Sequence, residues 1–394
     1  MTNEVLQKIA SDEQNISSSN GLEAKSPLLR FRKFTHPWRQ EKLSDFTSRI
    51  MRKNSNNETE LPLTISSKDG LVDQVTFFNK KVSSKDMSGY YLLKNGEFAY
   101  NKSYSNGYDF GSIKRLERYE MGALSTLYIC FSLKKHCSDY IKHYFDSLKW
   151  YRQIYIISAE GARNHGLLNV PTDDFFATIH FLSPDIEEQK KIADFLSLVD
   201  RRIEKQRQLV ESLKKYKRGV LSRIFNDVLE TVKLSDISNF ISSTRTLFTT
   251  LNSNKGTYPV YDATGIAGYI DHYDIDSDYV TIVKDGSGVG RLQKCDKKSS
   301  FIGTLGALVA KNCTTDFLYA VLQTIDFSKF VTGMAIPHIY YRDYKSTLLP
   351  FPSEEKQHFI SQLLKKFDIH IENETQKLTN MLTYKQGLLQ HMFI

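Results

Sequence analysis

Apolar residues recur along two stretches of the chain in alternating steps of four and three. The first stretch carries Ile192, Leu196, Val199, Ile203, Val210 and Leu213, and the second carries Ile360, Leu364, Phe367, Ile371, Leu378 and Met381. This heptad spacing is typical of a helix that packs along another helix. Polar residues interrupt both stretches at the same steps, with Gln206 and Lys217 in the first and Glu374 and Lys385 in the second. The pattern predicts two long helices whose apolar faces match in register.

We expect these helices to form an antiparallel coiled-coil pair within the chain. Each stretch covers about 40 residues, which is about 60 Å at 1.5 Å per residue and longer than most globular helices. An antiparallel arrangement is required if the two halves are related by an approximate two-fold axis. Gly219 and Gly387 lie inside the helical pattern, and a close helix crossing would explain both.

The two stretches are copies of each other. Residues 184–225 align without a gap on residues 352–393, and the identical pairs include Gln189 with Gln357 and Phe225 with Phe393. A shorter echo, Lys-Leu-Ser-Asp, begins at Lys42 and again at Lys233. Duplication of one ancestral unit is the simplest cause, so the chain is a pseudo-two-fold internal repeat.

A globular region precedes each helix. Short runs rich in Val, Ile, Tyr and Phe, separated by Gly, Asn and Asp, predict strands at 89–93, 98–100, 127–131, 279–283 and 307–309, and helices are expected at 139–150 and 316–325. We therefore expect α+β folds with mixed, twisted sheets. Beyond Lys-Leu-Ser-Asp the two regions do not align, which indicates a shared frame that carries two unlike domains.

The predicted organisation has five segments. They are a flexible tail (1–26), a first globular region (27–182), a central long helix (183–228), a second globular region (229–350) and a C-terminal long helix (351–394). The tail is polar and lacks the apolar core of a signal peptide, and no apolar run is long enough to span a membrane. We expect a cytoplasmic protein.

Composition narrows the function only slightly. The net charge of +8 is compatible with a polyanionic partner, although many basic proteins bind no nucleic acid. The cysteines, Cys130, Cys137, Cys295 and Cys313, form no CxxC pair and have no zinc-like spacing with histidines. We interpret them as reduced thiols and expect no metal site.

Motifs of catalysis are missing from the sequence. No Pro-Pro dipeptide is present, which excludes the motif that holds the target amine in amino-methyltransferases, and no Walker A sequence occurs. The glycines at 286, 288 and 290 lie between two strand-like runs and favour a tight loop over a phosphate-binding site. Asp173 and Asp174 lack the downstream Glu-x-Lys of common nuclease sites. We expect no catalytic site in this chain.

Several motifs give the sequence a family likeness. The first half opens with Pro-Leu-Leu-Arg-Phe at 27–31 and Trp38, and its globular region ends with Gly-Ala-Arg-Asn-His-Gly-Leu-Leu-Asn at 161–169. The helix start, Glu-Glu-Gln-Lys-Lys-Ile-Ala at 187–193, returns as a similar sequence from Pro352. The second half also has Ile-Gly-Thr-Leu-Gly at 302–306 and Gly-Met-Ala-Ile-Pro-His-Ile at 333–339. In these features the chain resembles the specificity subunit of type I restriction-modification enzymes from Pro27 onward.

The resemblance implies a DNA-binding subunit without activity of its own. Two target-recognition domains would recognise a bipartite, asymmetric site in double-stranded DNA. Two methylation subunits would dock on the chain and carry S-adenosylmethionine, and restriction subunits that use ATP and Mg would complete the nuclease.

Candidate DNA contacts combine basic, amide and hydroxyl groups in loops. In the first region they are Lys102, Ser105, Asn106, Tyr108, Arg163, Asn164 and His165, and in the second region they are Lys284, Ser287, Arg291 and His338. Lys102 suits a phosphate, Asn106 could pair with adenine, and Arg163 could reach guanine. The alternative for each residue is a solvated polar surface group.

The helix length bounds the unread gap between the two half-sites. DNA rises about 3.4 Å per base pair, so about 60 Å of helix corresponds to at most about 18 base pairs. Two other hypotheses stay open at this stage: a non-catalytic coiled-coil scaffold that binds proteins, and a stand-alone DNA enzyme.

Overall fold

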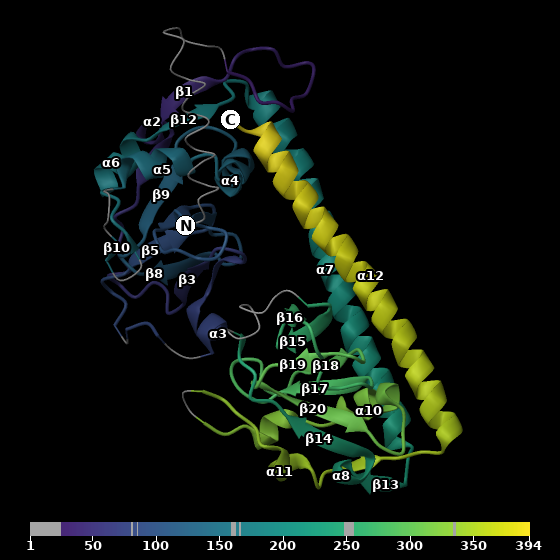
Figure 1. The fold of residues 1–394 in the computed structure, drawn as a ribbon. Coiled ribbons are helices and arrows are strands. Elements are labelled where there is room, and N and C mark those ends of the chain that lie inside the picture. The colour runs from purple at the N-terminus through teal and green to yellow at the C-terminus, as the bar shows by residue number, and fades with distance from the viewer. Residues whose placement is uncertain are drawn as a thin grey trace. The chain divides into compact units, whose positions relative to one another are not determined.

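The computed structural model describes residues 25–394, apart from residues 80–81, 85, 159–162, 165–166, 248–255 and 334–335. The chain divides into two compact units (Figure 1). Unit 1 contains Met1–Lys205 and Leu378–Ile394, and unit 2 contains Gln206–Lys377. Each unit therefore takes one globular region together with part of each long helix. This division differs from the five segments drawn from the sequence, whose boundaries stay a prediction.

The two long helices are α7 (Ile186–Asn226) and α12 (Glu354–Met392). Both start in the same way, because the amide of Gln189 donates to the carbonyl of Asp185 and the amide of Gln357 donates to that of Ser353. The acidic residues of each first turn favour the positive end of the helix dipole. All twelve predicted apolar interface positions are buried or half-buried.

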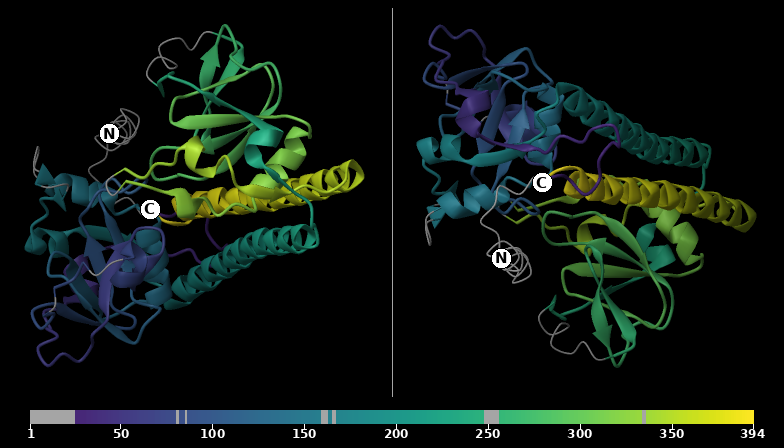
Figure 2. Two further views of the ribbon diagram at one scale, coloured as in Figure 1. Left: turned by 90° about the horizontal axis from the view of Figure 1, so that it is seen from below. Right: turned by 90° about the horizontal axis from the view of Figure 1, so that it is seen from above.

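Polar contacts fix the direction and register of the helix pair, whose members lie side by side in Figures 1 and 2. In unit 2, the Gln206 amide donates to the Glu374 carboxylate at 2.7 Å, and these residues occupy equivalent positions of the repeat. Lys217 contacts Asp368 at 2.6 Å in unit 2, and Lys385 contacts Asp200 at 2.6 Å in unit 1. The two ion pairs are equivalent, because each lysine and each aspartate stands at the same position in its own copy of the repeat. The predicted antiparallel pair is confirmed.

The close helix crossing expected at Gly219 and Gly387 is wrong. A Cβ atom added at either glycine would meet no neighbouring atom within 4 Å. Neither glycine is required by packing. Both simply lower the helix propensity at their positions.

Unit 1 is built mainly from strands, with short helices on its edges. Its elements are β1 (Arg39–Lys42), α2 (Leu43–Phe46), β2 (Thr47–Arg49), β3 (Pro62–Ser66), β4 (Gly70–Asp73), α3 (Gln74–Phe78), β5 (Tyr91–Lys94), β6 (Phe98–Asn101), β7 (Ser112–Arg115), β8 (Met121–Leu124), β9 (Ile129–Leu133), α4 (Ser138–Asp146), α5 (Tyr151–Ile157), β10 (Arg163–Asn164), β11 (Leu167–Leu168), α6 (Thr172–Ala177) and β12 (Ile179–Leu182). One sheet has the order β2-β9-β6-β7 and another has the order β4-β3-β8-β5. Strand β1 pairs with β12, which leads into α7.

Aromatic residues dominate the core of unit 1. Phe98 stacks on Phe131 with ring centroids 5.5 Å apart, and helix α4 covers this sheet. Phe393, after the end of α12, packs on Tyr140 and Tyr144 of α4. The core of unit 1 is therefore completed by residues from near both ends of the described chain.

Unit 2 has a similar construction. Its elements are β13 (Thr231–Lys233), α8 (Leu234–Ile237), β14 (Ser238–Ser242), β15 (Tyr258–Asp262), β16 (Gly265–Ile270), β17 (Tyr279–Val283), β18 (Leu292–Cys295), β19 (Ser300–Phe301), β20 (Leu305–Ala310), α10 (Thr315–Leu322), a 3-10 turn (Phe327–Phe330), α11 (Tyr341–Tyr344) and β21 (Leu348–Pro350). Its sheets have the orders β14-β20-β17-β18 and β16-β15-β19, and β13 pairs with β21. The predicted mixed α+β architecture is confirmed.

The two units share one topology, although their sequences do not align beyond Lys-Leu-Ser-Asp. Strands β2, β9, β6 and β7 correspond in order and direction to β14, β20, β17 and β18. The parallel pair β3–β8 corresponds to β15–β19. Unit 1 adds β5, α3, α5 and the β10–β11 hairpin.

Individual contacts repeat as well. Arg115 of β7 pairs with Asp139 of α4, and Lys294 of β18 pairs with Asp316 of α10, each at 2.6 Å. Phe393 packs on Tyr140 in unit 1 as Phe225 packs on Phe317 in unit 2. The duplication thus extends through both globular regions, where sequence alignment did not detect it.

The four cysteines are free thiols. Burial raises the pKa of Cys130 and of Cys295 to about 12, so both stay protonated at neutral pH. Within the described ranges, none of the helices combines the length and the apolar character that crossing a membrane requires.

Candidate nucleic-acid interface

The sequence-predicted residues fall on topologically equivalent loops of the two units. Lys102 is the first residue after β6, in the loop to β7, and Lys284 is the first residue after β17, in the loop to β18. The carbonyl of Lys102 accepts a hydrogen bond from the amide of Leu168 at 3.1 Å, and the carbonyl of Lys284 accepts one from Ile339 at 2.9 Å. Each hairpin loop therefore lies beside the segment that precedes the last short helix of its unit. Two separately predicted stretches come together in each unit.

In unit 1 the loop offers two polar side chains that have no partner among the described residues, and two other side chains pack within the unit. Asn106 is exposed in the turn and Lys102 is half-buried. The Ser105 hydroxyl lies 2.8 Å from the Ser67 hydroxyl. The Tyr108 side chain is half-buried, and the Lys114 ammonium lies 5.5 Å from the centre of its ring. Lys102 and Asn106 are thus better placed to contact a ligand than Ser105 and Tyr108.

The second predicted stretch of unit 1 is only partly described. Arg163 and Asn164 form β10, which pairs with Leu167 and Leu168 of β11. The side chains of Arg163 and Asn164, and His165 as a whole, lie outside the described residues. Their roles stay a prediction.

In unit 2 the glycine-rich segment is the tight loop that was expected. Gly286 has φ of +97°, a conformation that favours glycine, and its amide donates to the Pro337 carbonyl at 2.9 Å. Ser287 and Arg291 are exposed, and Arg291 donates to the carbonyl of Ala263 at 3.2 Å. The loop presents these polar groups at one end of the β17–β18 hairpin.

His338 belongs to a small aromatic and basic cluster that sequence analysis found only in part. Its ring centroid lies 4.9 Å from that of Tyr340, and the Arg342 guanidinium lies 4.7 Å from the centre of the Tyr340 ring. Tyr340 is 46% exposed and the Arg342 side chain is 75% exposed. A guanidinium held over an exposed ring suits stacking on bases and pairing with phosphate. The signal available in the sequence was the spacing of His338, Tyr340 and Arg342, which stand at every second position.

A hollow beside Lys102 was also missed. Its lining includes Arg49, Lys102, Thr126 and Thr172. Two cationic side chains and two hydroxyls are the donors that phosphate oxygens accept from in protein–DNA contacts. Arg49 and Thr172 are far apart in the sequence, so no local pattern could have grouped them.

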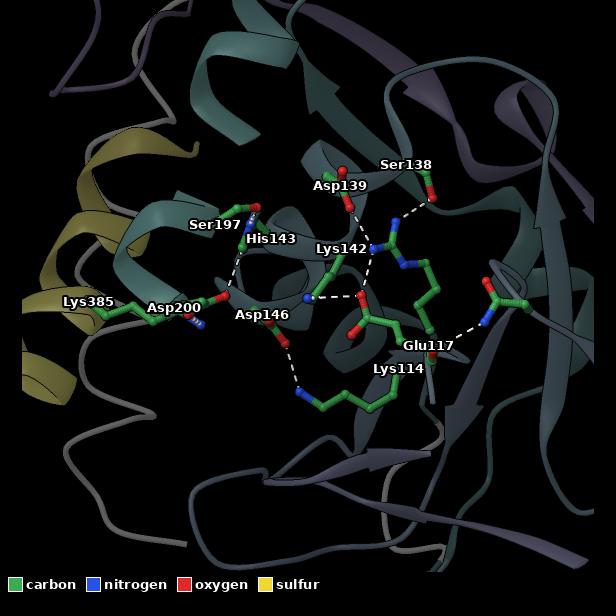
Figure 3. Close-up of polar contacts among 12 residues, drawn as sticks. Lys114, Glu117, Ser138, Asp139, Lys142, His143, Asp146, Ser197, Asp200 and Lys385 are labelled. Atoms are coloured by element: carbon green, nitrogen blue, oxygen red, sulfur yellow. Dashed lines mark hydrogen bonds and ion pairs between the residues drawn. The ribbon is translucent and has the colours of Figure 1, made fainter. Parts of the chain in front are cut away.

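Two buried or half-buried ion pairs of unit 1 have a structural role. Asp146 of α4 pairs with Lys114 of β7 at 2.7 Å, while Asp200 of α7 pairs with Lys385 of α12 (Figure 3). Between them, His143 Nε2 lies 3.2 Å from the Ser197 hydroxyl. Burial disfavours the charged form of Lys114, but the neighbouring Asp146 carboxylate raises the pKa of Lys114 above its usual value. These charges neutralise one another and tie α4 to the sheet and to the helices.

The described residues contain no group of three or more His, Cys, Asp or Glu residues arranged to hold a metal ion. Asp173 and Asp174 lie in the first turn of α6, where acids stabilise a helix N-terminus.

Comparisons with known proteins point to one family. A model of the type I restriction modification DNA specificity domain matches residues 226–383. The chain is 26% identical over 129 residues to the type I restriction enzyme EcoprrI specificity subunit of Escherichia coli, and 30% identical over 166 residues to a putative type I specificity subunit of Mycoplasma pneumoniae. These matches cover 32% and 40% of this chain, and 30% and 51% of the relatives, so about half or less of each relative is spanned.

Solved structures match over a larger part of the chain. The S subunit of a type I restriction-modification system from M. genitalium is 15% identical with a TM-score of 0.54, covering 94% of this chain and 99% of that one. A chain from a study of assembly and conformational transition of the type I system is 14% identical with a TM-score of 0.52, covering 90% and 97%. At such identity the likeness supports the fold. Residues 226–383 match the family of type I restriction modification DNA specificity domains, and both curated relatives are named as type I specificity subunits.

Proposed function

We propose that this chain recognises a bipartite, asymmetric site in double-stranded DNA and has no catalytic activity of its own. The observation that carries the proposal is the equivalent placement of Lys102 and Lys284, each at the start of a hairpin loop that lies beside a second polar segment. One topology presents two sets of loop side chains that differ in chemistry. Two such surfaces suit two half-sites of unlike sequence.

Each loop would contact one half-site in the major groove, where all four base pairs are distinguishable. Lys102, Lys284, Arg291 and Arg342 would bind phosphates and position the protein. Asn106, Ser287 and His338 are better suited to base edges because they carry directional donors and acceptors.

The family places the catalytic chemistry in partner subunits. Two copies of a methylation subunit, which carries S-adenosylmethionine, would dock on this chain, and restriction subunits with ATP and Mg would join them in the cytoplasm. The helix repeat supports two equivalent docking positions. Tyr216 and Tyr384 occupy the same place in the two copies and are 63% and 61% exposed.

Co-expression with the methylation subunit and mapping of methylated adenines across a genome tests this function. Exchange of residues 42–182 for the first domain of another family member should change one half-site and leave the other unchanged. A simultaneous change of both half-sites would contradict the assignment of one half-site to each unit.

Single substitutions sharpen the test. Lys102→Ala and Lys284→Ala should each weaken binding to all DNA sequences. Each should also reduce the slope of log affinity against log salt concentration by about one. Lys311 provides the control, because it follows β20 at the end of the sheet opposite the Lys284 loop. Lys311→Ala should leave DNA affinity unchanged. Equal losses for Lys284→Ala and Lys311→Ala would mean that general charge, not the loop, binds DNA.

A further inference from the structure

Unit 1 contains a segment that unit 2 lacks. Residues 25–38, which we call the arm, lead into β1 and cover the start of α7. The amide of Leu29 donates to the carbonyl of His391 near the end of α12. Phe31 packs edge-on against Phe195, and Lys191 lies over the Phe31 ring. The arm therefore covers a corner between the start of α7 and the end of α12.

A buried carboxylate holds the arm in place. Both Glu188 oxygens accept from the Arg30 guanidinium, at 2.6 and 2.9 Å, and the Trp38 indole donates to the same carboxylate at 3.2 Å. The Glu188 side chain is fully buried and Trp38 is 4% exposed. Outside this buried contact, Lys33 pairs with Glu187 at 3.4 Å on the surface.

The equivalent corner of unit 2, which we call the second corner, is formed by Leu229, Lys356, Phe359 and Leu363. Counting back from Lys-Leu-Ser-Asp, Leu229 stands where Trp38 stands, and the helix repeat places Lys356, Phe359 and Leu363 at the positions of Glu188, Lys191 and Phe195. The backbone confirms the placement of Leu229, since Phe351 donates to the carbonyl of Glu230 just before α12 begins.

The second corner is uncovered in unit 2. Leu229 is 95% exposed and Phe359 is 58% exposed. Lys356 is half-buried, and it makes no hydrogen bond or ion pair with any residue in the described part of the chain. Exposed apolar side chains around a half-buried cation are typical of a surface that another chain covers.

We propose that the second corner binds an extended segment of a partner protein, which takes the place that the arm takes in unit 1. The residues of the second corner define the chemistry of that segment. Lys356 replaces Glu188, so a carboxylate must stand where Arg30 stands. Phe359 and Leu363 replace Lys191 and Phe195. An aromatic residue of the partner segment is therefore favoured at the position that Phe31 has in the arm. Glu355 preserves the charge of Glu187, so a basic residue remains favoured at the position of Lys33.

A charge-reversed copy of the arm is the probe for this site. A fluorescent peptide with the sequence of residues 27–38 and Arg30→Glu should bind the full chain saturably in an anisotropy titration. Lys356→Glu should weaken this binding at least tenfold and should create binding of the peptide with native Arg30. Leu229→Ser, at a side chain that is 95% exposed, should weaken binding with no change in folding.

Lys365→Glu is the matched control. Lys365 is exposed on the same helix and lies nine residues from Lys356, which at 100° per residue places it on the opposite face. It should leave peptide binding unchanged. The proposal is overturned if the Arg30→Glu peptide does not bind, or if Lys365→Glu and Lys356→Glu weaken binding equally. It is also overturned if removal of residues 2–24 strengthens peptide binding tenfold, because the occupant would then be this chain's own tail.

Discussion

The two units fold alike although their sequences diverged almost beyond recognition. Both place a hairpin with a lysine at its start beside a second polar segment, and both anchor a helix through an aromatic contact at its first turn. The differences are concentrated in what is added to this frame: unit 1 has the arm, extra short helices and buried histidines, and unit 2 has none of these in its described residues. The comparison shows that one frame carries two different sets of loops while a few anchoring contacts persist.

The strongest test of this likeness is the pair of anchoring phenylalanines. Phe393 is 2% exposed and Phe225 is 3% exposed, so Phe393→Ala and Phe225→Ala should each cost about 3–5 kcal/mol. Phe393→Ala should increase hydrogen exchange in unit 1 alone, and Phe225→Ala should increase it in unit 2 alone. Phe359→Ala, at an exposed position, should change stability by less than about 0.5 kcal/mol. Loosening of both units by either core substitution would show that the contacts are not equivalent.

Acid should destabilise unit 1 more than unit 2. Burial lowers the pKa of His143 to about 4, against the opposing pull of Asp200 and Asp146, and burial lowers the pKa of His180 to about 3. Both folded pKa values lie below the ordinary value of 6.5, so the unfolded chain binds more protons as the pH falls below 6.5. Stability is therefore full above that pH, and each histidine should cost about 2 kcal/mol at pH 5.

Hydrogen exchange at pH 7 and pH 5, corrected for intrinsic rates, provides the measurement. Unit 1 should lose protection between these values while unit 2 changes less, since His272, His358 and His370 are exposed. His143→Gln should reduce the loss in unit 1. Equal loss in the two units would mean that the buried histidines do not cause the acid sensitivity.

The arm contact provides a third contrast between the units. Glu188→Ala leaves Arg30 and the Trp38 indole without their shared acceptor, and removal of one partner of a buried ion pair costs about 3 kcal/mol. The equivalent change in unit 2, Lys356→Ala, removes a side chain without a partner in the described structure and should cost less than about 0.5 kcal/mol. Urea unfolding followed by circular dichroism measures both variants, and Trp38 and Trp150 fluorescence reports on unit 1 separately. Comparable losses for the two variants would contradict the asymmetry of the two corners.

The smallest expected effect concerns the reciprocal ion pairs of the helices. Asp200→Asn and Asp368→Asn should each lower stability by about 1 kcal/mol or less, because both carboxylates are partly exposed. The two values should agree, since the pairs are copies of each other. Double-mutant cycles with Lys385→Met and Lys217→Met measure both coupling energies. A large difference between them would show that the two halves of the helix pair have diverged in function.

Much of the frame could be predicted from the sequence, because long periodic segments carry a strong signal. The helix pair was predicted in register from Gln206, Glu374 and the apolar steps around them. The shared topology of the globular regions was not predicted. Their strands are two to six residues long, too short for a periodic signal, and loops of unequal length disrupt an ungapped alignment. Asp139 and Asp316 are visibly equivalent only once the strands that they follow are known.

For the candidate site, the sequence shows which residues carry suitable chemistry but not which of them lie together. Lys102 and Lys284 were chosen for their chemistry alone, and the structure placed them at matching positions. Tyr340 and Arg342 were missed because the sequence shows their spacing from His338 but not the ring contacts that join the three side chains. Arg49 and Thr172 meet through tertiary folding alone.

The two units differ in when their chains are completed during synthesis. Unit 2 is one continuous stretch, so its chain is complete when Lys377 has been made. Unit 1 draws on Leu388, Leu389, Met392 and Phe393 for its core, and these residues are made long after Lys205. At roughly 5–20 residues per second, the intervening stretch takes on the order of 10–40 s to synthesise. The unit that leaves the ribosome first therefore waits, with part of its core open, for the second unit to be finished.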